Sequence, residues 1–129
     1  MGTSDWSRWG CVSTVPLYLC VALNPFPVSH NVDFYSGESE KILPMLYKQN
    51  IIADVVILDP LRKGCEKQVL DTIIEMSPNK IVYVSCNPQT LARDIKILES
   101  GGYNLKAVQP LDQFPWTTHT ESVCKLIRL

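Results

Sequence analysis

The stretch IVYVSCNP at residues 81–88 decides the fold, because an apolar run ends there in a cysteine and a helix start follows directly. The run is rich in β-branched residues and predicts a buried strand. Asn87 is a favoured N-cap and Pro88 suits the first helical position, so a helix through Leu98 is expected. Cys86 then stands beside the positive end of a helix dipole, where the thiolate form is favoured. This position suits a nucleophile, although a cysteine that ends an apolar strand is often only a small buried apolar residue.

The chain from residue 31 onward alternates strand and helix patterns. Strands are expected at residues 32–35, 53–58, 103–109 and 122–129, in addition to the one that ends at Cys86. Helices are expected at residues 40–49, at residues 65–76 and after Pro88, the last one ending at Gly101 and Gly102. Alternation at this short spacing predicts an α/β domain with a largely parallel sheet.

Three reactive side chains are expected at one edge of this sheet. Asp59 and Cys86 end consecutive strands, so both lie at the carboxyl edge, where ligands bind in open α/β folds. Glu121 precedes the last strand and reaches the same edge if that strand is antiparallel. A thiol and a carboxylate on one rim can supply a nucleophile and a general base. The alternatives are an exposed strand-edge charge for Glu121 and an N-cap or loop carboxylate for Asp59.

Size, charge and cysteine usage restrict the class of protein. The chain has 129 residues, 46% of them hydrophobic and 19% charged, which predicts one soluble globular domain. A formal net charge of -1 gives no argument for a polyanionic partner, so any RNA is bound locally or by a part outside this sequence. The five cysteines include no CxxC pair, and no histidine cluster accompanies them. This pattern argues against a disulfide framework or a zinc site and favours the reducing cytoplasm.

The segment before residue 31 carries the weakest pattern. Its apolar run at residues 11–23 is interrupted by Pro16 and is too short to cross a bilayer, so no membrane association is expected. Asp5 and the lack of a clear small-residue cleavage site argue against a signal peptide. We predict a strand at residues 15–23, followed by a break at residues 24–27.

Three motifs, taken in order, resemble the bacterial RNA (uracil-5-)-methyltransferase family, which acts on ribosomal and transfer RNA. They are DPLRKGC at residues 59–65, YVSCNPQTLARD at residues 83–94 and DQFPWTTHTE at residues 112–121. The corresponding family patterns are DPPRKGC, YVSCNPxTLARD and DxFPxTxHVE. This chain departs from them at Leu61 and Thr120, and Trp116 stands where a smaller or polar residue is common in the family. The resemblance covers residues 31–129 and implies the C-terminal catalytic part of a Rossmann-like class I methyltransferase domain, whose last strand is antiparallel.

The resemblance also implies a role for individual residues. It assigns the nucleophile to Cys86 and the proton-abstracting base to Glu121. The residues expected on the cofactor side are Asp59 and Glu40, and those expected to meet the substrate are Arg62, Asn87 and His119. The implied cofactor is S-adenosyl-L-methionine, and the implied partner is RNA, with ribosomal RNA favoured. The implied reaction is methylation of uridine at C5 through a covalent bond between the Cys86 sulfur and C6 of uracil.

Several parts of the family domain have no counterpart in this sequence. These are its first two strands, its glycine-rich cofactor loop and the acidic residue that holds the ribose. Without them, the strand that precedes Asp59 has an unpaired edge in the middle of the sheet. We expect residues 15–23 to fill this gap as a surrogate strand, or two chains to pair there as a homodimer. The alternative function is a non-catalytic remnant or interaction module that dimerises or recruits a partner through this edge.

Overall fold

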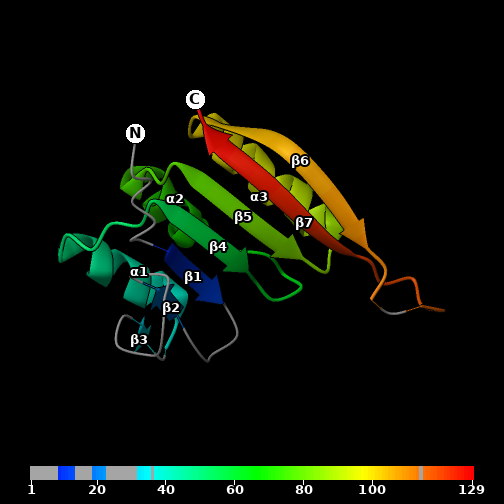
Figure 1. The fold of residues 1–129 in the computed structure, drawn as a ribbon, viewed down its shortest axis with the longest axis horizontal. Coiled ribbons are helices and arrows are strands. Elements are labelled where there is room, and N and C mark those ends of the chain that lie inside the picture. The colour runs from blue at the N-terminus through cyan, green and yellow to red at the C-terminus, as the bar shows by residue number, and fades with distance from the viewer. Residues whose placement is uncertain (1–8, 14–18, 23–31, 36, 114) are drawn as a thin grey trace, which may run out of the picture.

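A seven-stranded sheet forms the centre of the structure (Figure 1). The computed structural model describes residues 9–13, 19–22, 32–35, 37–113 and 115–129, with side chains from Tyr35 onward. The strands are β1 (Trp9–Ser13), β2 (Leu19–Ala22), β3 (Val32–Tyr35), β4 (Val55–Asp59), β5 (Lys80–Ser85), β6 (Tyr103–Leu111) and β7 (Glu121–Arg128). The helices are α1 (Ser39–Lys48), α2 (Lys67–Met76) and α3 (Pro88–Ser100). The strand order is β3-β2-β1-β4-β5-β7-β6.

The strand directions bring the ends of β4 and β5 to the edge where β7 begins. β1, β4 and β5 are parallel, whereas β7 is antiparallel to both of its neighbours, β5 and β6. Ser85, the last residue of β5, pairs with Ser122, the second residue of β7. The predicted α/β class with an antiparallel last strand is therefore confirmed. The sheet is mixed rather than largely parallel, because four of its six strand pairings are antiparallel. The elements predicted from residue 32 onward are all present, and their boundaries differ from the predicted ones by at most two residues.

The edge of β4 that was expected to be unpaired is covered by β1. Residues 9–13 run parallel to β4, with Cys11 opposite Ile57. The prediction that residues 15–23 fill this gap is wrong. Leu19–Ala22 forms β2, which pairs with β1 and β3, and the rest of that segment lies outside the described residues. WGCVS is a weak strand signal because it is short and contains a glycine, and its place is fixed by pairing with the distant β4.

This pairing removes the basis of the edge-recruitment hypothesis. β4 has β1 on one side and β5 on the other, so it offers no free edge to a second chain or to a partner. The homodimer expected at that edge therefore has no support in the strand order.

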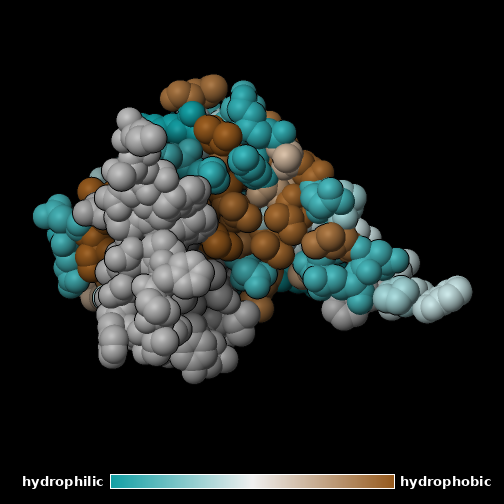
Figure 2. Space-filling view, in the orientation of Figure 1, coloured by the Kyte–Doolittle hydropathy of each residue, from teal (hydrophilic) through white to brown (hydrophobic). Residues whose placement is uncertain are grey.

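The hydrophobic core lies between the sheet and its helices. In Figure 1, α2 and α3 lie behind the sheet, and α1 packs beside α2. Buried side chains alternate along the central strands: Val56 and Leu58 on β4, Ile81 and Tyr83 on β5, Cys124 and Leu126 on β7. The intervening side chains face the other way, where apolar residues gather over the middle strands (Figure 2). These partly buried residues are Val55, Ile57, Val82, Val84, Val123 and Ile127.

Candidate active site

Cys86 lies in the two-residue connection between β5 and α3. Ser85 closes this turn, because its hydroxyl accepts a hydrogen bond from Asn87 N at 3.1 Å and donates one to Asn87 O at 3.0 Å. Asn87 caps α3 through its Oδ1 atom, which accepts a hydrogen bond from Gln89 N at 3.0 Å, and Pro88 follows as the first helical residue. The predicted helix start is thus confirmed. The thiol of Cys86 is held, partly exposed, at the carboxyl edge of the sheet.

Two cavities share Cys86. A cleft of about 490 Å³ is lined by Arg62, Cys86, Asn87, Pro88, Gln89, Thr118, His119 and Thr120. A smaller cavity of about 180 Å³ is lined by Arg62, Cys86, Thr117, His119 and Glu121. The structure therefore brings Cys86 and Glu121 together, because β7 begins where β5 ends. Arg62 and His119 join them in both cavities, whereas Asn87 borders only the larger one. The neighbouring threonines and Gln89 were not predicted as site residues.

Arg62 and His119 form a hydrogen-bonded pair across the site. The Nη2 atom of Arg62 lies 3.0 Å from Nδ1 of His119. A guanidinium has donors only, so Nδ1 of His119 must be the acceptor. The imidazole is then neutral and carries its proton on Nε2. The pair joins the loop after β4 to the loop before β7, two segments that are 57 positions apart in the sequence.

The loop at residues 61–65, which we call the Arg62 loop, is attached to α3. Asn87 Nδ2 and Thr90 Oγ1 each donate to Arg62 O at 3.1 Å. Further along the helix, Arg93 and Asp94 bond the backbone of the same loop. Thr90, Arg93 and Asp94 were not predicted as site residues. The available signal was Asp94 itself, a charged residue beside the apolar positions of a helix whose inner face is buried.

The other described thiols differ from Cys86 in burial. Burial raises the pKa of Cys65 to about 12, and it also raises the pKa of Cys124. Both groups therefore stay protonated at neutral pH. Cys86 is the partly exposed one among the three cysteines whose side chains are described. No group of three or more His, Cys, Asp or Glu in the described part of the chain could hold a metal ion.

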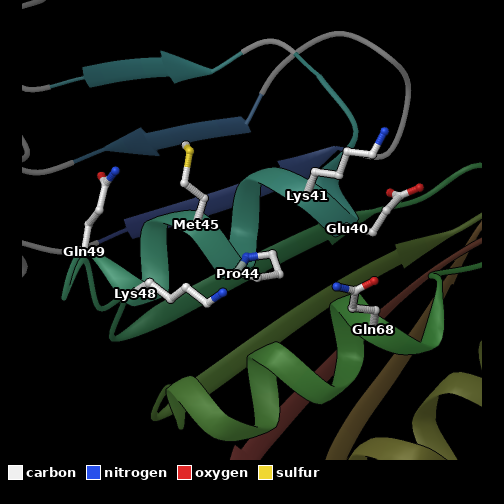
Figure 3. Close-up of a pocket in the computed structure, with 7 residues that line it drawn as sticks. All are labelled: Glu40, Lys41, Pro44, Met45, Lys48, Gln49 and Gln68. Carbon is white, nitrogen blue, oxygen red and sulfur yellow. The ribbon is translucent and has the colours of Figure 1, made fainter.

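Asp59 and Glu40 do not line the two Cys86 cavities. Asp59 is exposed at the end of β4. Glu40, in the first turn of α1, borders a pocket of about 220 Å³ together with Lys63 and Gly64 of the Arg62 loop. It also borders a groove of about 540 Å³ between α1 and α2, where Gln68 comes from α2 (Figure 3). The two predicted cofactor residues thus lie outside the cavities that hold the predicted nucleophile and base.

Comparison with known proteins identifies the family. The model of the tRNA (uracil-5-)-methyltransferase family matches residues 31–129. The chain belongs to this family. A protein of Halalkalibacterium halodurans described as an uncharacterized RNA methyltransferase is 57% identical over 96 residues, which are 74% of this chain and 21% of that protein. A protein of Clostridium tetani with the same description is 56% identical over 93 residues, or 72% of this chain and 20% of that protein.

One solved structure agrees with membership in the (uracil-5-)-methyltransferase family, and a second shows the fold. The Pyrococcus abyssi tRNA (uracil-54, C5)-methyltransferase, in complex with S-adenosyl-L-homocysteine, is 44% identical with a TM-score of 0.54. That match covers 58% of this chain and 18% of the other. The M1.HpyAVI-SAM complex, at 19% identity and a TM-score of 0.57, covers 73% of this chain and 52% of its own and shows a shared fold.

The chain spans about a fifth of the length of these two curated relatives. Its three motifs lie inside the matched range and carry Cys86, Glu121, Arg62 and His119. Among the described residues, no helix is long and apolar enough to cross a membrane.

Proposed function

We propose that residues 31–129 carry the catalytic part of an enzyme that methylates uridine at C5 in RNA, with ribosomal RNA as the substrate. The observation that carries this proposal is the cavity of about 180 Å³ in which Cys86, Glu121, Arg62 and His119 meet. Substitution at C5 of uracil needs a nucleophile and a base on one site, and a thiol and a carboxylate supply them. The family match supports the same reaction class.

The two catalytic residues act in turn on adjacent carbons of the uracil ring. C5 is a weak nucleophile, so the Cys86 thiolate first forms a bond to C6, and the electron pair of the C5–C6 double bond moves into an enolate. S-adenosyl-L-methionine, when bound, supplies the electrophilic methyl group for C5. Glu121 then accepts the C5 proton, the double bond re-forms, and the Cys86 thiolate leaves C6. Glu121 returns its proton to water, which restores both residues.

Arg62 and His119 are placed to hold the uracil. The Arg62 guanidinium uses one donor on His119, and the neutral imidazole presents Nε2–H as a further donor. Negative charge develops on the C4 oxygen in the enolate, and fixed donors beside the nucleophile stabilise such charge. Asn87 lines the larger cleft with its amide already bonded to Arg62 O and Gln89 N, so we assign it to shaping the entrance.

The base must leave its RNA stack to reach Cys86, as in other enzymes that modify bases. The larger cleft beside Cys86 is open to solvent along the loop before β7. Trp116 in this loop is 102% exposed and adopts a positive φ of 74°, so its ring is available as a stacking surface for a neighbouring base. A small net charge gives no general attraction for RNA, so binding through local contacts of this kind is consistent with it. A catalytic free thiol fits an enzyme of the reducing cytoplasm.

The residues present fit S-adenosyl-L-methionine only on one side. Glu40 and the Arg62 loop border the pocket of about 220 Å³, on the side that we assign to the adenosine, and Asp59 ends the adjacent β4. β1 and β2 are antiparallel neighbours, whereas in nucleotide-binding sheets the first strand is followed by a glycine-rich turn and a helix that lead to a parallel strand. The cofactor's other half would depend on a part of the protein outside these residues.

Exchange of the uracil C5 hydrogen with solvent deuterium tests the proposal without the cofactor. Addition of Cys86 at C6 lets C5 take up deuterium, and Glu121 then removes the original proton before the thiolate leaves. We expect exchange in a uridine-containing ribosomal RNA hairpin, measured by mass spectrometry, and less exchange in a transfer RNA T-arm hairpin. Cys86→Ala should abolish exchange, whereas Cys124→Ala, a change at a buried thiol on β7, should retain it. Exchange that persists in Cys86→Ala would contradict the proposed nucleophile.

A further inference from the structure

Five hydrogen bonds join α3 and its cap to the backbone of the Arg62 loop. Asn87 and Thr90 both donate to Arg62 O, each at 3.1 Å. Arg93 Nη2 donates to Lys63 O at 3.0 Å and to Cys65 O at 3.2 Å. Cys65 N donates to the Asp94 carboxylate at 2.8 Å. The side chains at positions 87, 90, 93 and 94 follow helical spacing, so one face of α3 contacts successive residues of the loop.

Gly64 allows this close contact. Its φ is 80°, and a Cβ atom at this position would lie 2.6 Å from Arg93 Nη2, 2.6 Å from Asp94 Oδ2 and 3.1 Å from Thr90 Cβ. A side chain there would displace the very groups that bond the loop. The glycine therefore lets the loop backbone lie directly on the helix.

Asp94 is a fully buried carboxylate with a complete set of partners. Tyr83 Oη donates to it at 2.5 Å, Arg93 Nε at 2.8 Å and Cys65 N at 2.8 Å. A buried charge lowers stability unless it is paired and hydrogen-bonded, so a carboxylate at this point needs a structural reason. Its partners belong to β5, α3 and the Arg62 loop, the three segments that surround Cys86.

We propose that Thr90, Arg93 and Asp94 are positioning residues, through which α3 sets the place of Arg62 relative to the Cys86 thiol. The helix starts two residues after Cys86 and holds the backbone of Arg62 from its flank, so it fixes both groups in one frame. Arg62 can then reach His119 and complete the cavity that also contains Glu121. That this arrangement affects catalysis rests on the proposed function. That α3 fixes the position of Arg62 does not depend on it.

Thr90→Val tests the inference because it removes the hydroxyl and keeps the shape of the side chain. The matched control is Thr72→Val in α2, where the Thr72 hydroxyl donates to Gln68 O at 2.8 Å and bonds no loop. Both variants lose a bond within their own helix, but only Thr90→Val loses one to Arg62 O. Thr90→Ser restores the hydroxyl. Asn87→Asp is a second variant, which keeps an oxygen for the cap and loses the donor to Arg62 O.

Two readouts separate this inference from the proposed function. The first is the nitrogen-15 spectrum of the His119 imidazole, which reports whether Nδ1 is a fixed acceptor and needs no RNA. We expect Thr90→Val and Asn87→Asp to shift His119 toward a mixture of tautomers, and Thr72→Val and Thr90→Ser to match the wild type. The second is the rate of C5 deuterium exchange, which should fall about tenfold in Thr90→Val, the scale of one lost hydrogen bond at a reacting site.

The outcomes are distinct. A wild-type His119 spectrum in both Thr90→Val and Asn87→Asp would overturn the positioning role. An altered spectrum with an unchanged exchange rate would overturn its catalytic consequence. If the wild-type protein itself shows no exchange, the proposed function fails, while the His119 spectra still decide whether α3 positions Arg62.

Discussion

Replacing Gly64 by alanine tests how tightly the Arg62 loop is packed on α3, and Gly102 provides the matched control. Both glycines adopt positive φ values, 80° for Gly64 and 93° for Gly102, so alanine is strained at either position. They differ in their surroundings. A Cβ on Gly102 would meet nothing within 4 Å, whereas a Cβ on Gly64 would lie 2.6 Å from both Arg93 Nη2 and Asp94 Oδ2.

The expected loss of stability has two contributions, the backbone strain at positive φ and the close contacts of the added Cβ atom. Alanine at positive φ costs about 1–2 kcal/mol, and the lower entropy of its unfolded chain offsets part of this, so Gly102→Ala should lower the free energy of unfolding by about 1 kcal/mol. At Gly64 the groups in contact must also move by about 0.8 Å to reach an ordinary contact of 3.4 Å. Such a shift breaks at least one hydrogen bond to a charged group, which adds about 2 kcal/mol and gives a total of about 3 kcal/mol for Gly64→Ala.

Thermal and urea unfolding followed by circular dichroism measure the difference. A change of 1 kcal/mol corresponds to roughly 4 °C for a domain of this size, so the midpoint should fall by about 4 °C in Gly102→Ala and by about 12 °C in Gly64→Ala. Equal losses in the two variants would refute the reasoning, because they would show that only backbone strain matters at Gly64 and that the loop is not pressed against Arg93 and Asp94.

Three further predictions concern the thiols, the cap and a buried tyrosine. Iodoacetamide at pH 8 should modify Cys86 before Cys65 and Cys124, whose pKa values are raised by burial; peptide mapping that finds Cys65 modified first would contradict this. Asn87→Ala should lower the free energy of unfolding by about 1 kcal/mol through loss of the α3 cap, whereas Asn87→Asp should lose less in the same urea titration. Burial raises the pKa of Tyr103 from 10.0 to about 12, so its neutral form is favoured by folding. This stability is complete below pH 10 and is lost as pH rises toward 12, and an unfolding midpoint unchanged between pH 9 and pH 12 would count against it.

The sequence predicted correctly those elements that depend on residues close together in the chain. The β5 strand, the Asn87 cap and the α3 helix depend on residues close together in the chain, and each is found where its pattern placed it. The approach of Glu121 to Cys86 depends on a distant pairing, that of β7 with β5, and it was predicted on the condition that the last strand is antiparallel.

The errors and omissions concern contacts between distant segments. The neighbour of β4 is Trp9–Ser13 because of five paired residues more than forty positions away, and nothing within WGCVS indicates that partner. The contact of α3 with the Arg62 loop was missed for a related reason. Thr90 and Arg93 read as ordinary surface residues of a helix, and their partners are backbone atoms of a loop 28 to 30 positions earlier.

The candidate site lies between a packed segment, α3, and an exposed one, the loop before β7. On one side, Cys86 and Arg62 are fixed by α3, whose Asp94 is buried with all its partners in place. On the other side, His119 belongs to the loop before β7, in which every described residue from 115 to 120 is exposed. Exposed loops with few buried contacts open more easily than packed elements. The His119 side is therefore expected to move more readily than the side formed by Cys86 and Arg62, and the Arg62–His119 bond is the contact that joins the two sides.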